Sequence, residues 1–280
     1  MISDITLGQF FPGSSVIHRL DPRTKIILAM LYIVAVFTAN TFLAFAYLVV
    51  LTAFLLVLSR ISFSVIFKGI KPIIFIVLFT ALINIFLTKG TEETKIFEFW
   101  ILEVYNEGII RAVFMAVRVI ILIIGTSTLL TYTTSPISLT DGIESLLAPL
   151  KLIKIPVHIF AMMMTIALRF IPTLIEETEK IMNAQKSRGA DFTSGGLIKR
   201  VKVLIPILIP LFVSSFKRAE ELATAMECRC YRGDKNRTKL VKLSFRFSDF
   251  AFVALFILFA ALSIYLRVAS NGNEMFYQIP

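Results

Sequence analysis

Two segments of the chain end in an arginine flanked by small residues, four positions after an alanine. One reads Ala184-Gln185-Lys186-Ser187-Arg188-Gly189, and the other reads Ala225-Met226-Glu227-Cys228-Arg229-Cys230. Residues four apart share one face of a helix, and the rigid donor fork of arginine matches carboxylates and backbone oxygens. A single arginine at a helix C-terminus would only complement the helix dipole, by about 0.3–1 kcal/mol. The repetition instead predicts two similar helix ends that dock into two similar sites.

Little else in the sequence indicates catalysis. The chain lacks the phosphate-binding pattern G-x-x-x-x-G-K-[ST] and the zinc pattern H-E-x-x-H. Its two cysteines, Cys228 and Cys230, and its two histidines, His18 and His158, are not spaced as a metal site. The sequence therefore predicts a chain that is not an enzyme, with no catalytic residue, bound metal or cofactor.

Each arginine segment closes an amphipathic stretch that follows an apolar, proline-containing one. The two apolar stretches are residues 156–175 and 203–216. Apolar and charged residues then occupy opposite helical faces. After the first stretch, the apolar face is Leu174, Ile175, Ile181 and Met182, and the charged face is Glu176, Glu177, Glu179 and Lys180. After the second stretch begins, the apolar face is Phe212, Phe216, Leu222 and Met226, and the charged face is Lys217, Arg218, Glu220 and Glu221. This period predicts amphipathic helices, which lie along or reach out of a membrane interface more often than they span it. The sequence leaves open whether 156–175 and 203–216 span.

The composition requires a membrane around these helices. Hydrophobic residues make up 57% of the 280 residues and charged residues 17%, against about 25% charged residues in a soluble domain. The mean hydropathy is +0.82. We therefore expect an all-α polytopic membrane protein with about five transmembrane helices and long amphipathic cytoplasmic helices.

The apolar runs locate the spans. A transmembrane helix needs about 20 apolar residues, so the run 26–58 predicts a hairpin of two short helices that turns near Asn40 and Thr41. Further spans are expected at 72–88, opened by Pro72, at 108–132 and at 247–268. The predicted parts are an N-terminal bundle of four spans (1–133), a coupling-helix region (134–246), and a last span with a short tail (247–280).

The charges predict the orientation. The net charge is +10, and Lys and Arg concentrate on the cytoplasmic side of membrane proteins. Basic residues precede the first span, lie between the second and third, and fill 134–246, whereas 89–107 is acidic. We expect the N-terminus and 134–246 in the cytoplasm and the C-terminus outside. Nucleic-acid binding is not expected, because no aromatic-basic motif accompanies the charge.

Three motifs in order resemble one family. The first motif is Ser15-Val16-Ile17-His18-Arg19-Leu20-Asp21-Pro22-Arg23-Thr24-Lys25. The second motif is Ala167-Leu168-Arg169-Phe170-Ile171-Pro172, followed by Glu176-Glu177, Ala184-Gln185 and Arg188-Gly189. The third motif is Ala225-Met226, Arg229, Tyr231 and Gly233. Together they resemble the T component (EcfT) of energy-coupling-factor transporters, over nearly the whole chain. Asp21-Pro22-Arg23 is expected to cap the first helix.

The resemblance implies a function and partners. The triplets Ser187-Arg188-Gly189 and Cys228-Arg229-Cys230 would each dock in one of two ABC-type ATPase subunits, identical or paralogous. Ala184, Gln185, Ala225 and Met226 would support them. The third partner would be one substrate-binding S component for a vitamin or micronutrient, gripped by apolar faces around Met162, Met163, Met164, Phe212 and Phe216. The family more often has Ala-Arg-Gly, so Cys230 in place of glycine is the larger departure.

Two alternatives stay open on sequence grounds. A conventional ABC importer permease also needs cytoplasmic coupling helices, but Glu220-Glu221-Leu222-Ala223 lacks the glycine expected in its loop. A membrane-embedded enzyme is the other alternative, and the missing polar cluster weighs against it.

Overall fold

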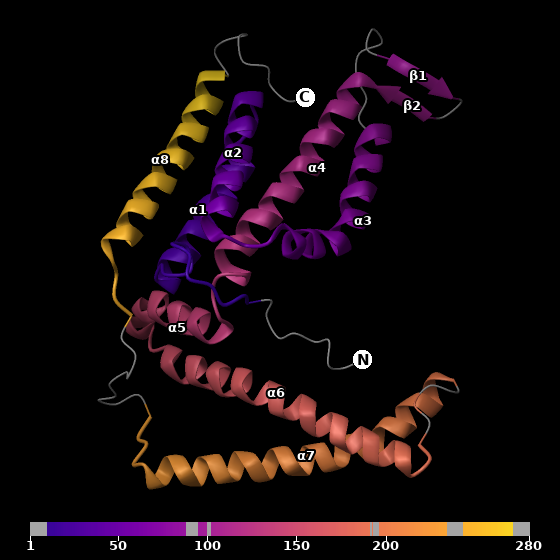
Figure 1. The fold of residues 1–280 in the computed structure, drawn as a ribbon, viewed down its shortest axis with the longest axis vertical. Helices are drawn as coiled ribbons and strands as arrows, with labels where there is room; N and C mark the ends of the chain where they lie inside the picture. Colours follow the sequence, from indigo (N-terminus) through magenta and orange to yellow (C-terminus); the bar gives the residue numbers. More distant parts are fainter. Residues whose placement is uncertain are drawn as a thin grey trace. The chain divides into compact units, whose positions relative to one another are not determined.

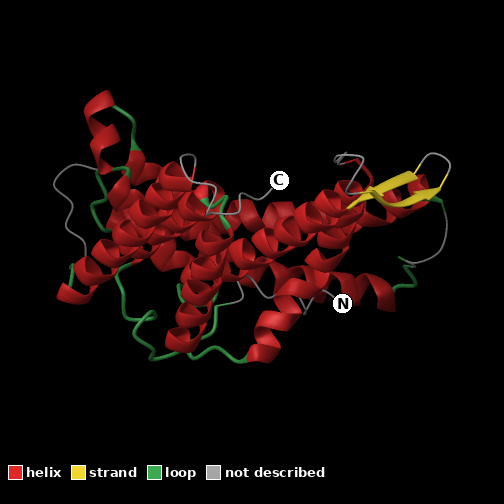
Figure 2. Cartoon of the chain, turned by 90° about the horizontal axis from the view of Figure 1, so that it is seen from above, coloured by secondary structure: helices red, strands yellow, loops and turns green. Residues whose placement is uncertain are grey.

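The computed structural model describes residues 10–87, 95–99, 102–190, 192, 196–233 and 243–270. The chain separates into two compact units, residues 8–142 with 243–280 and residues 143–242, and each is described by itself. Helices dominate both (Figure 1), and Figure 2 shows one strand pair among the described residues. The predicted all-α membrane fold class is confirmed.

The first unit is a bundle that contains the N-terminal helices and the last one. Its helices are α1 (Pro22–Thr38), α2 (Phe42–Ser59), α3 (Phe63–Leu87), α4 (Asn106–Thr126) and α8 (Phe247–Ser270), and a π-helical turn, η2 (Ser127–Thr131), extends α4. An antiparallel hairpin of β1 (Lys95–Phe99) and β2 (Leu102–Tyr105) joins α3 to α4. The sequence analysis did not predict this hairpin.

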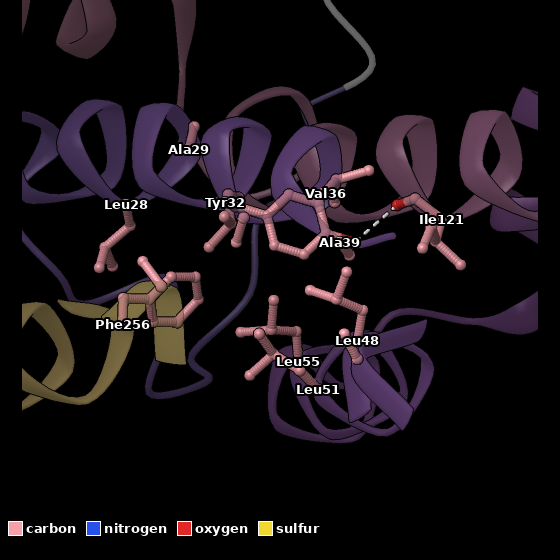
Figure 3. Packing of buried hydrophobic residues seen from close by; sticks show 14 of the residues in the cluster. Leu28, Ala29, Tyr32, Val36, Ala39, Leu48, Leu51, Leu55, Ile121 and Phe256 are labelled. Carbon is pink, nitrogen blue, oxygen red and sulfur yellow. Dashed lines mark hydrogen bonds between the residues drawn. The ribbon is translucent and has the colours of Figure 1, made fainter. Parts of the chain in front are cut away.

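The core of the bundle forms where α1, α2, α4 and α8 meet. Its buried side chains interdigitate around Tyr32 (Figure 3): Leu28, Val36, Leu48, Leu51, Leu55, Ile121 and Phe256. The Tyr32 hydroxyl donates to the carbonyl of Ile121 at 2.8 Å and pairs with the Thr52 hydroxyl at 2.7 Å. Gly125 makes room for this ring, because a Cβ there would lie 2.3 Å from the ring carbons of Tyr32.

The predicted helical hairpin is present. The helices α1 and α2 have 17 and 18 residues and are separated by only three residues, 39–41. Asp21 is the N-cap of α1, and its carboxylate accepts from the backbone amide of Arg23 at 2.9 Å. The predicted role of Asp21-Pro22-Arg23 in starting this helix is therefore confirmed.

The predicted start of the third span at Pro72 is wrong. The helix α3 begins nine residues earlier, at Phe63, and Pro72 lies inside it. Figure 1 shows that α3 is bent, and proline is a common cause of helix kinks because it removes a backbone donor and clashes with the preceding turn. Ser64, Lys68 and Lys71 interrupt the apolar residues before Pro72, which hid their helicity from a hydropathy argument.

The second unit contains the two longest helices. After the 3-10 helix η3 (Ala148–Ile153) come α6 (Val157–Ser187) and α7 (Leu197–Cys228). The helix α5 (Pro136–Leu146) crosses the boundary between the units. By length and composition, five described helices could cross a membrane: α2, α3, α4 with η2, α6 and α8. The helix α1, with 17 residues, is just too short to be counted among them. The helix α6, which contains most of the stretch 156–175, is long and apolar enough to span.

Candidate functional site

The helices α6 and α7, called the coupling helices below, cross and pack against each other (Figure 1). Each runs without interruption through its prolines, Pro172 in α6 and Pro206 and Pro210 in α7. The start of α6 is tied to α5, because the Nδ1 atom of His158 lies 2.9 Å from a carboxylate oxygen of Glu144 and both side chains are buried.

A polar cluster joins the two coupling helices on their charged faces. The Arg218 guanidinium donates to the Glu177 carboxylate at 3.1 Å, and the Ser214 hydroxyl donates to the other oxygen of the same carboxylate. Arg218 also lies over the ring of Phe170, 5.8 Å from its centroid. The predicted amphipathic faces thus meet at the crossing, where one carboxylate of α6 binds two residues of α7.

An apolar groove of about 260 Å³ runs beside this cluster. Phe170 and Leu174 of α6 line one side, and Leu222, Ala223 and Met226 of α7 line the other. The stripe predicted downstream of Pro210 therefore lines this groove, whereas of the stripe predicted downstream of Pro172 only Leu174 does so. Much of the remaining apolar surface of α7 is exposed, including Phe212 at 66% and Phe216 at 62%.

The two arginine segments form helix ends with matching hydrogen bonds. On α6, the Gly189 amide donates to the carbonyl of Lys186 and the Ala190 amide donates to that of Gln185, both at 3.0 Å. On α7, the Cys230 amide donates to the carbonyl of Glu227 at 2.8 Å and the Tyr231 amide donates to that of Met226 at 3.0 Å. Both pairs have the spacing of the Schellman motif, in which the residue after the cap is left-handed.

The left-handed residues are Gly189, with φ of 87°, and Cys230, with φ of 58°. Glycine enters this region without a Cβ clash, whereas an L-residue costs roughly 1–2 kcal/mol there. The departure from glycine at Cys230 therefore leaves the cap geometry intact at some energetic cost. Each arginine occupies the cap position, one residue before the left-handed one.

The side chains of both triplets are exposed: Ser187, Arg188, Gly189, Cys228, Arg229 and Cys230. Among the supporting positions, Ala184 and Ala225 are exposed and Gln185 and Met226 are half-buried, so the two ends agree position by position. No side-chain hydrogen bond or ion pair engages Arg188 or Arg229 within the described residues. Both cysteines are free thiols.

The bundle contains charged residues for which the sequence predicted no role. Lys25 is 1% exposed, and its ammonium donates to the carbonyls of Thr133 at 2.8 Å and His18 at 3.3 Å and to the Thr134 hydroxyl at 3.0 Å. Asp249, also 1% exposed, accepts from the backbone amides of Asp21 at 2.9 Å and Arg246 at 2.6 Å. These contacts fasten the start of α1 to the start of α8 and to the segment after α4.

Arg118 is a third charged residue for which the sequence predicted no role. Its guanidinium donates to the carbonyl of Ala39 at 2.7 Å and lies 5.1 Å from the centroid of the Phe45 ring, so it holds the turn between α1 and α2. Its position within an apolar run could have identified it, because a charged residue inside a membrane span is costly and binds an internal partner.

His18 belongs to the N-terminal motif but lies outside the helices. Its Nε2 atom is 3.0 Å from the carbonyl oxygen of Phe11, and its Nδ1 atom is 2.6 Å from the Ser15 hydroxyl. Burial lowers the pKa of His18, against a smaller opposing effect of the hydrogen bond to Phe11. In the neutral ring Nε2 then donates to the carbonyl and Nδ1 accepts from Ser15. The motif therefore shapes the entry into α1.

Comparison with known proteins follows the same motifs. The family model described as CbiQ, cobalt transport protein, matches residues 13–240. An energy-coupling factor transporter transmembrane protein EcfT from Clostridium kluyveri is 53% identical over 268 residues, which are 96% of this chain and 98% of that protein. The chain belongs to the EcfT family. An EcfT protein from Ruminiclostridium cellulolyticum is 54% identical over 92% of this chain and 96% of that protein. An EcfT protein from Bacillus subtilis is 50% identical over 95% of this chain and all of that protein.

Membership confirms the predicted resemblance and makes the chain the transmembrane component of an energy-coupling factor transporter. It is a multi-pass membrane protein, and the helices α2, α3, α4 and α8 are where the sequence predicted spans.

Proposed function

We propose that this EcfT chain is a non-catalytic coupling subunit that transmits ATP-driven motion from two cytoplasmic ATPases to a separate substrate-binding subunit. The observation that carries the proposal is the matched geometry of the two helix ends at Arg188 and Arg229. Two equivalent ends suit two equivalent sites, such as those of an ABC-type ATPase pair, identical or paralogous. Family membership favours this function over an importer permease with its own substrate path.

The arginines are suited to this docking. Each guanidinium is exposed at a cap whose last carbonyls are already engaged by backbone amides, so its donors are available to an ATPase carboxylate or carbonyl. Removal of one partner from a desolvated charged contact costs about 2–5 kcal/mol at an interface. Each 1.4 kcal/mol is tenfold in affinity, so one arginine at each end is enough to control assembly.

A small S component that carries a vitamin or micronutrient would be the third partner. The exposed apolar side chains of the coupling helices, among them Met163, Met164, Phe212 and Phe216, offer it a surface, and Met162 is half-buried beside them. Methionine-rich surfaces repack around different partners. Different S components would therefore fit the same face.

The proposed orientation places the N-terminus and 134–246 in the cytoplasm and the C-terminus outside, in a cell membrane. The acidic segment 89–107 is described only in part, and the tail after 270 lies outside the described residues. Single cysteines at Asn106, Ser62 and Lys186, in a chain without Cys228 and Cys230, test the orientation. An impermeant thiol reagent applied to intact cells should label only Asn106→Cys; labelling only at Ser62→Cys and Lys186→Cys would invert the topology.

The docking experiment compares two double variants that remove the same charge. Arg188→Ala/Arg229→Ala should recover little ATPase in a pull-down at matched membrane expression, and each single variant should recover an intermediate amount. Lys186→Ala/Arg232→Ala is the matched control, because both side chains are exposed beside the triplets, and it should assemble normally. Lys at positions 188 and 229 should rescue poorly, because it lacks the planar fork. Normal recovery by the double alanine variant would refute the proposed docking role.

The subunit ratio is a separate test of the same proposal. Native mass spectrometry of the purified complex should give two ATPase subunits and one S component for each chain. The chain alone should not hydrolyse ATP. One ATPase per chain, or ATP turnover by the chain alone, would contradict the proposal.

A further inference from the structure

A basic cavity of about 720 Å³ opens at one end of the bundle. Arg19, before α1, Arg60, at the end of α2, and Arg246, before α8, line it together with Ser14 and Ser248. Three segments far apart in the sequence therefore bring three guanidinium groups and the hydroxyls of Ser14 and Ser248 around one space. Ser15 also lines it, but its hydroxyl is already hydrogen-bonded to His18. No acidic residue is among its lining residues.

The charge of this cavity is uncompensated within the described part of the chain. The described residues provide no ion pair or hydrogen bond to the guanidinium groups of Arg19, Arg60 or Arg246. The nearby carboxylate of Asp249 is buried, and its two oxygens accept from the backbone amides of Asp21 and Arg246. That acid is already engaged by the backbone, so the cavity keeps a net positive charge and suits an anion.

Apolar side chains border the same cavity. Val57 and Val16 line it and are 74% and 47% exposed. In water such side chains would add nothing to the binding of a small anion. At a membrane interface they lie beside acyl chains, and basic pockets at the ends of transmembrane helices on the cytoplasmic side bind anionic headgroups.

We propose that this cavity binds the phosphate-bearing headgroup of an anionic phospholipid. The three arginines and the two serines bind the phosphate, and the acyl chains leave the site along Val57 and Val16. The site is separate from the arginine helix ends of α6 and α7, so the proposal does not depend on the docking function. The orientation proposed above assigns the lipid to the cytoplasmic leaflet.

The test measures lipid retention by the full chain in detergent with equal amounts of phosphatidylglycerol and phosphatidylethanolamine. Native mass spectrometry should detect one phosphatidylglycerol retained in preference to phosphatidylethanolamine. Each basic residue near an anionic surface contributes about fivefold in affinity, so Arg60→Gln/Arg246→Gln should weaken retention by roughly 25-fold. Lys68→Gln/Lys71→Gln is the matched control, because it removes two exposed charges of α3 that do not line the cavity, and it should retain the lipid.

A second variant keeps the test decisive if the double variant does not fold. Arg19→Gln alone, on the exposed turn before α1, should weaken retention by about fivefold. Equal retention of both lipids by the wild type, or equal loss in the Lys68/Lys71 control, would overturn the proposal. An arm with millimolar inorganic phosphate distinguishes the sources of the anion: resistance to displacement supports the lipid, whereas full displacement would show a phosphate site to which the apolar border contributes nothing.

Discussion

The bundle and the coupling helices bury their side chains to very different extents. In the most apolar window of α2, 39% of the residues are buried, against 6% in that of α6. The described part of α7 buries only Ile207. Within the bundle, α1, α2, α4 and α8 share a buried core, and α3, whose most apolar window has no buried residue, is the exception. The helices α6 and α7 leave most of their apolar surface uncovered. The difference indicates that one region is built for internal stability and the other for contact with lipid and partners.

The charged residues of the two regions follow the same division. Lys25 is buried in the bundle, and its ammonium donates three hydrogen bonds. Arg188 and Arg229 are exposed at the ends of the coupling helices. A buried charge without partners is costly, so Lys25 must be satisfied by the fold. The two exposed arginines are free to be satisfied by another protein.

The strongest test of this division is Lys25→Met. The substitution keeps the length of the side chain but leaves two carbonyls and the Thr134 hydroxyl without their buried donor. Lost hydrogen bonds to a charged group of this kind should cost about 3 kcal/mol, which lowers the melting temperature of the detergent-purified chain by roughly 5–10 °C. Lys186→Met, at an exposed site on α6, is the control and should melt as the wild type does. Equal melting of Lys25→Met and wild type would contradict a structural role for Lys25.

A leucine pair separates packing from partner contact. Leu51 is 2% exposed in the bundle and Leu208 is 58% exposed on α7. Lipid is as apolar as leucine, so truncation in a membrane mainly forfeits packing contacts, and Leu51→Ala should cost about 2 kcal/mol. Leu208→Ala should leave unfolding unchanged and weaken capture of the S component. Denaturant titration and pull-down of the S component on both variants check this. A destabilised Leu208→Ala together with a Leu51→Ala that only loses capture of the S component would contradict the comparison.

A tyrosine pair tests a smaller effect in the same way. Tyr32→Phe removes the hydroxyl that bridges Thr52 and the carbonyl of Ile121, which should cost about 1–1.5 kcal/mol. Tyr265→Phe, at a position that is 68% exposed, should change the unfolding free energy by less than about 0.5 kcal/mol. Denaturant titrations measure both changes as shifts of the unfolding midpoint, compared at an equal slope of free energy against denaturant concentration. Identical midpoints for the two variants would mean that the bridge does not stabilise the core.

The sequence predicted those features that depend on composition and local spacing. Apolar runs located α2, α4 and α8, the charged face indicated the amphipathic ends of α6 and α7, and Asp21 marked the start of α1. The start of α3 was predicted wrongly because proline is common at helix starts yet is also tolerated inside a kinked helix. The β1–β2 hairpin was missed because the segment 89–107 was interpreted from its acidic charge alone, although residues 95–105 are rich in the aromatic and β-branched types that favour strands.

The site residues were predictable to a different degree. Spacing alone paired Arg188 with Arg229, but it could not show that Cys230 takes the same left-handed conformation as Gly189, because that follows from the hydrogen bonds at the cap. Thr133 and Thr134, which bind Lys25, and Asp21, which binds Asp249, lie more than a hundred residues away from them in sequence. Contacts at such separation are tertiary, and no local pattern encodes them.

The smallest expected effect concerns the polar cluster at the crossing of α6 and α7. Glu177→Gln keeps the shape of the side chain but removes the charge that pairs with Arg218, and both side chains are about a quarter exposed. Partly exposed ion pairs contribute about 0.5 kcal/mol, so unfolding should hardly change. The orientation of the helix ends should change more, because this cluster is the described polar link between the coupling helices. Spin labels at the exposed positions 184 and 225 should give a broader distance distribution in Glu177→Gln than in wild type. The double variant Glu177→Gln/Arg218→Gln should broaden it no further, since each single change already breaks the pair. A distribution of unchanged width in both variants would show that apolar packing in the neighbouring groove fixes the crossing by itself.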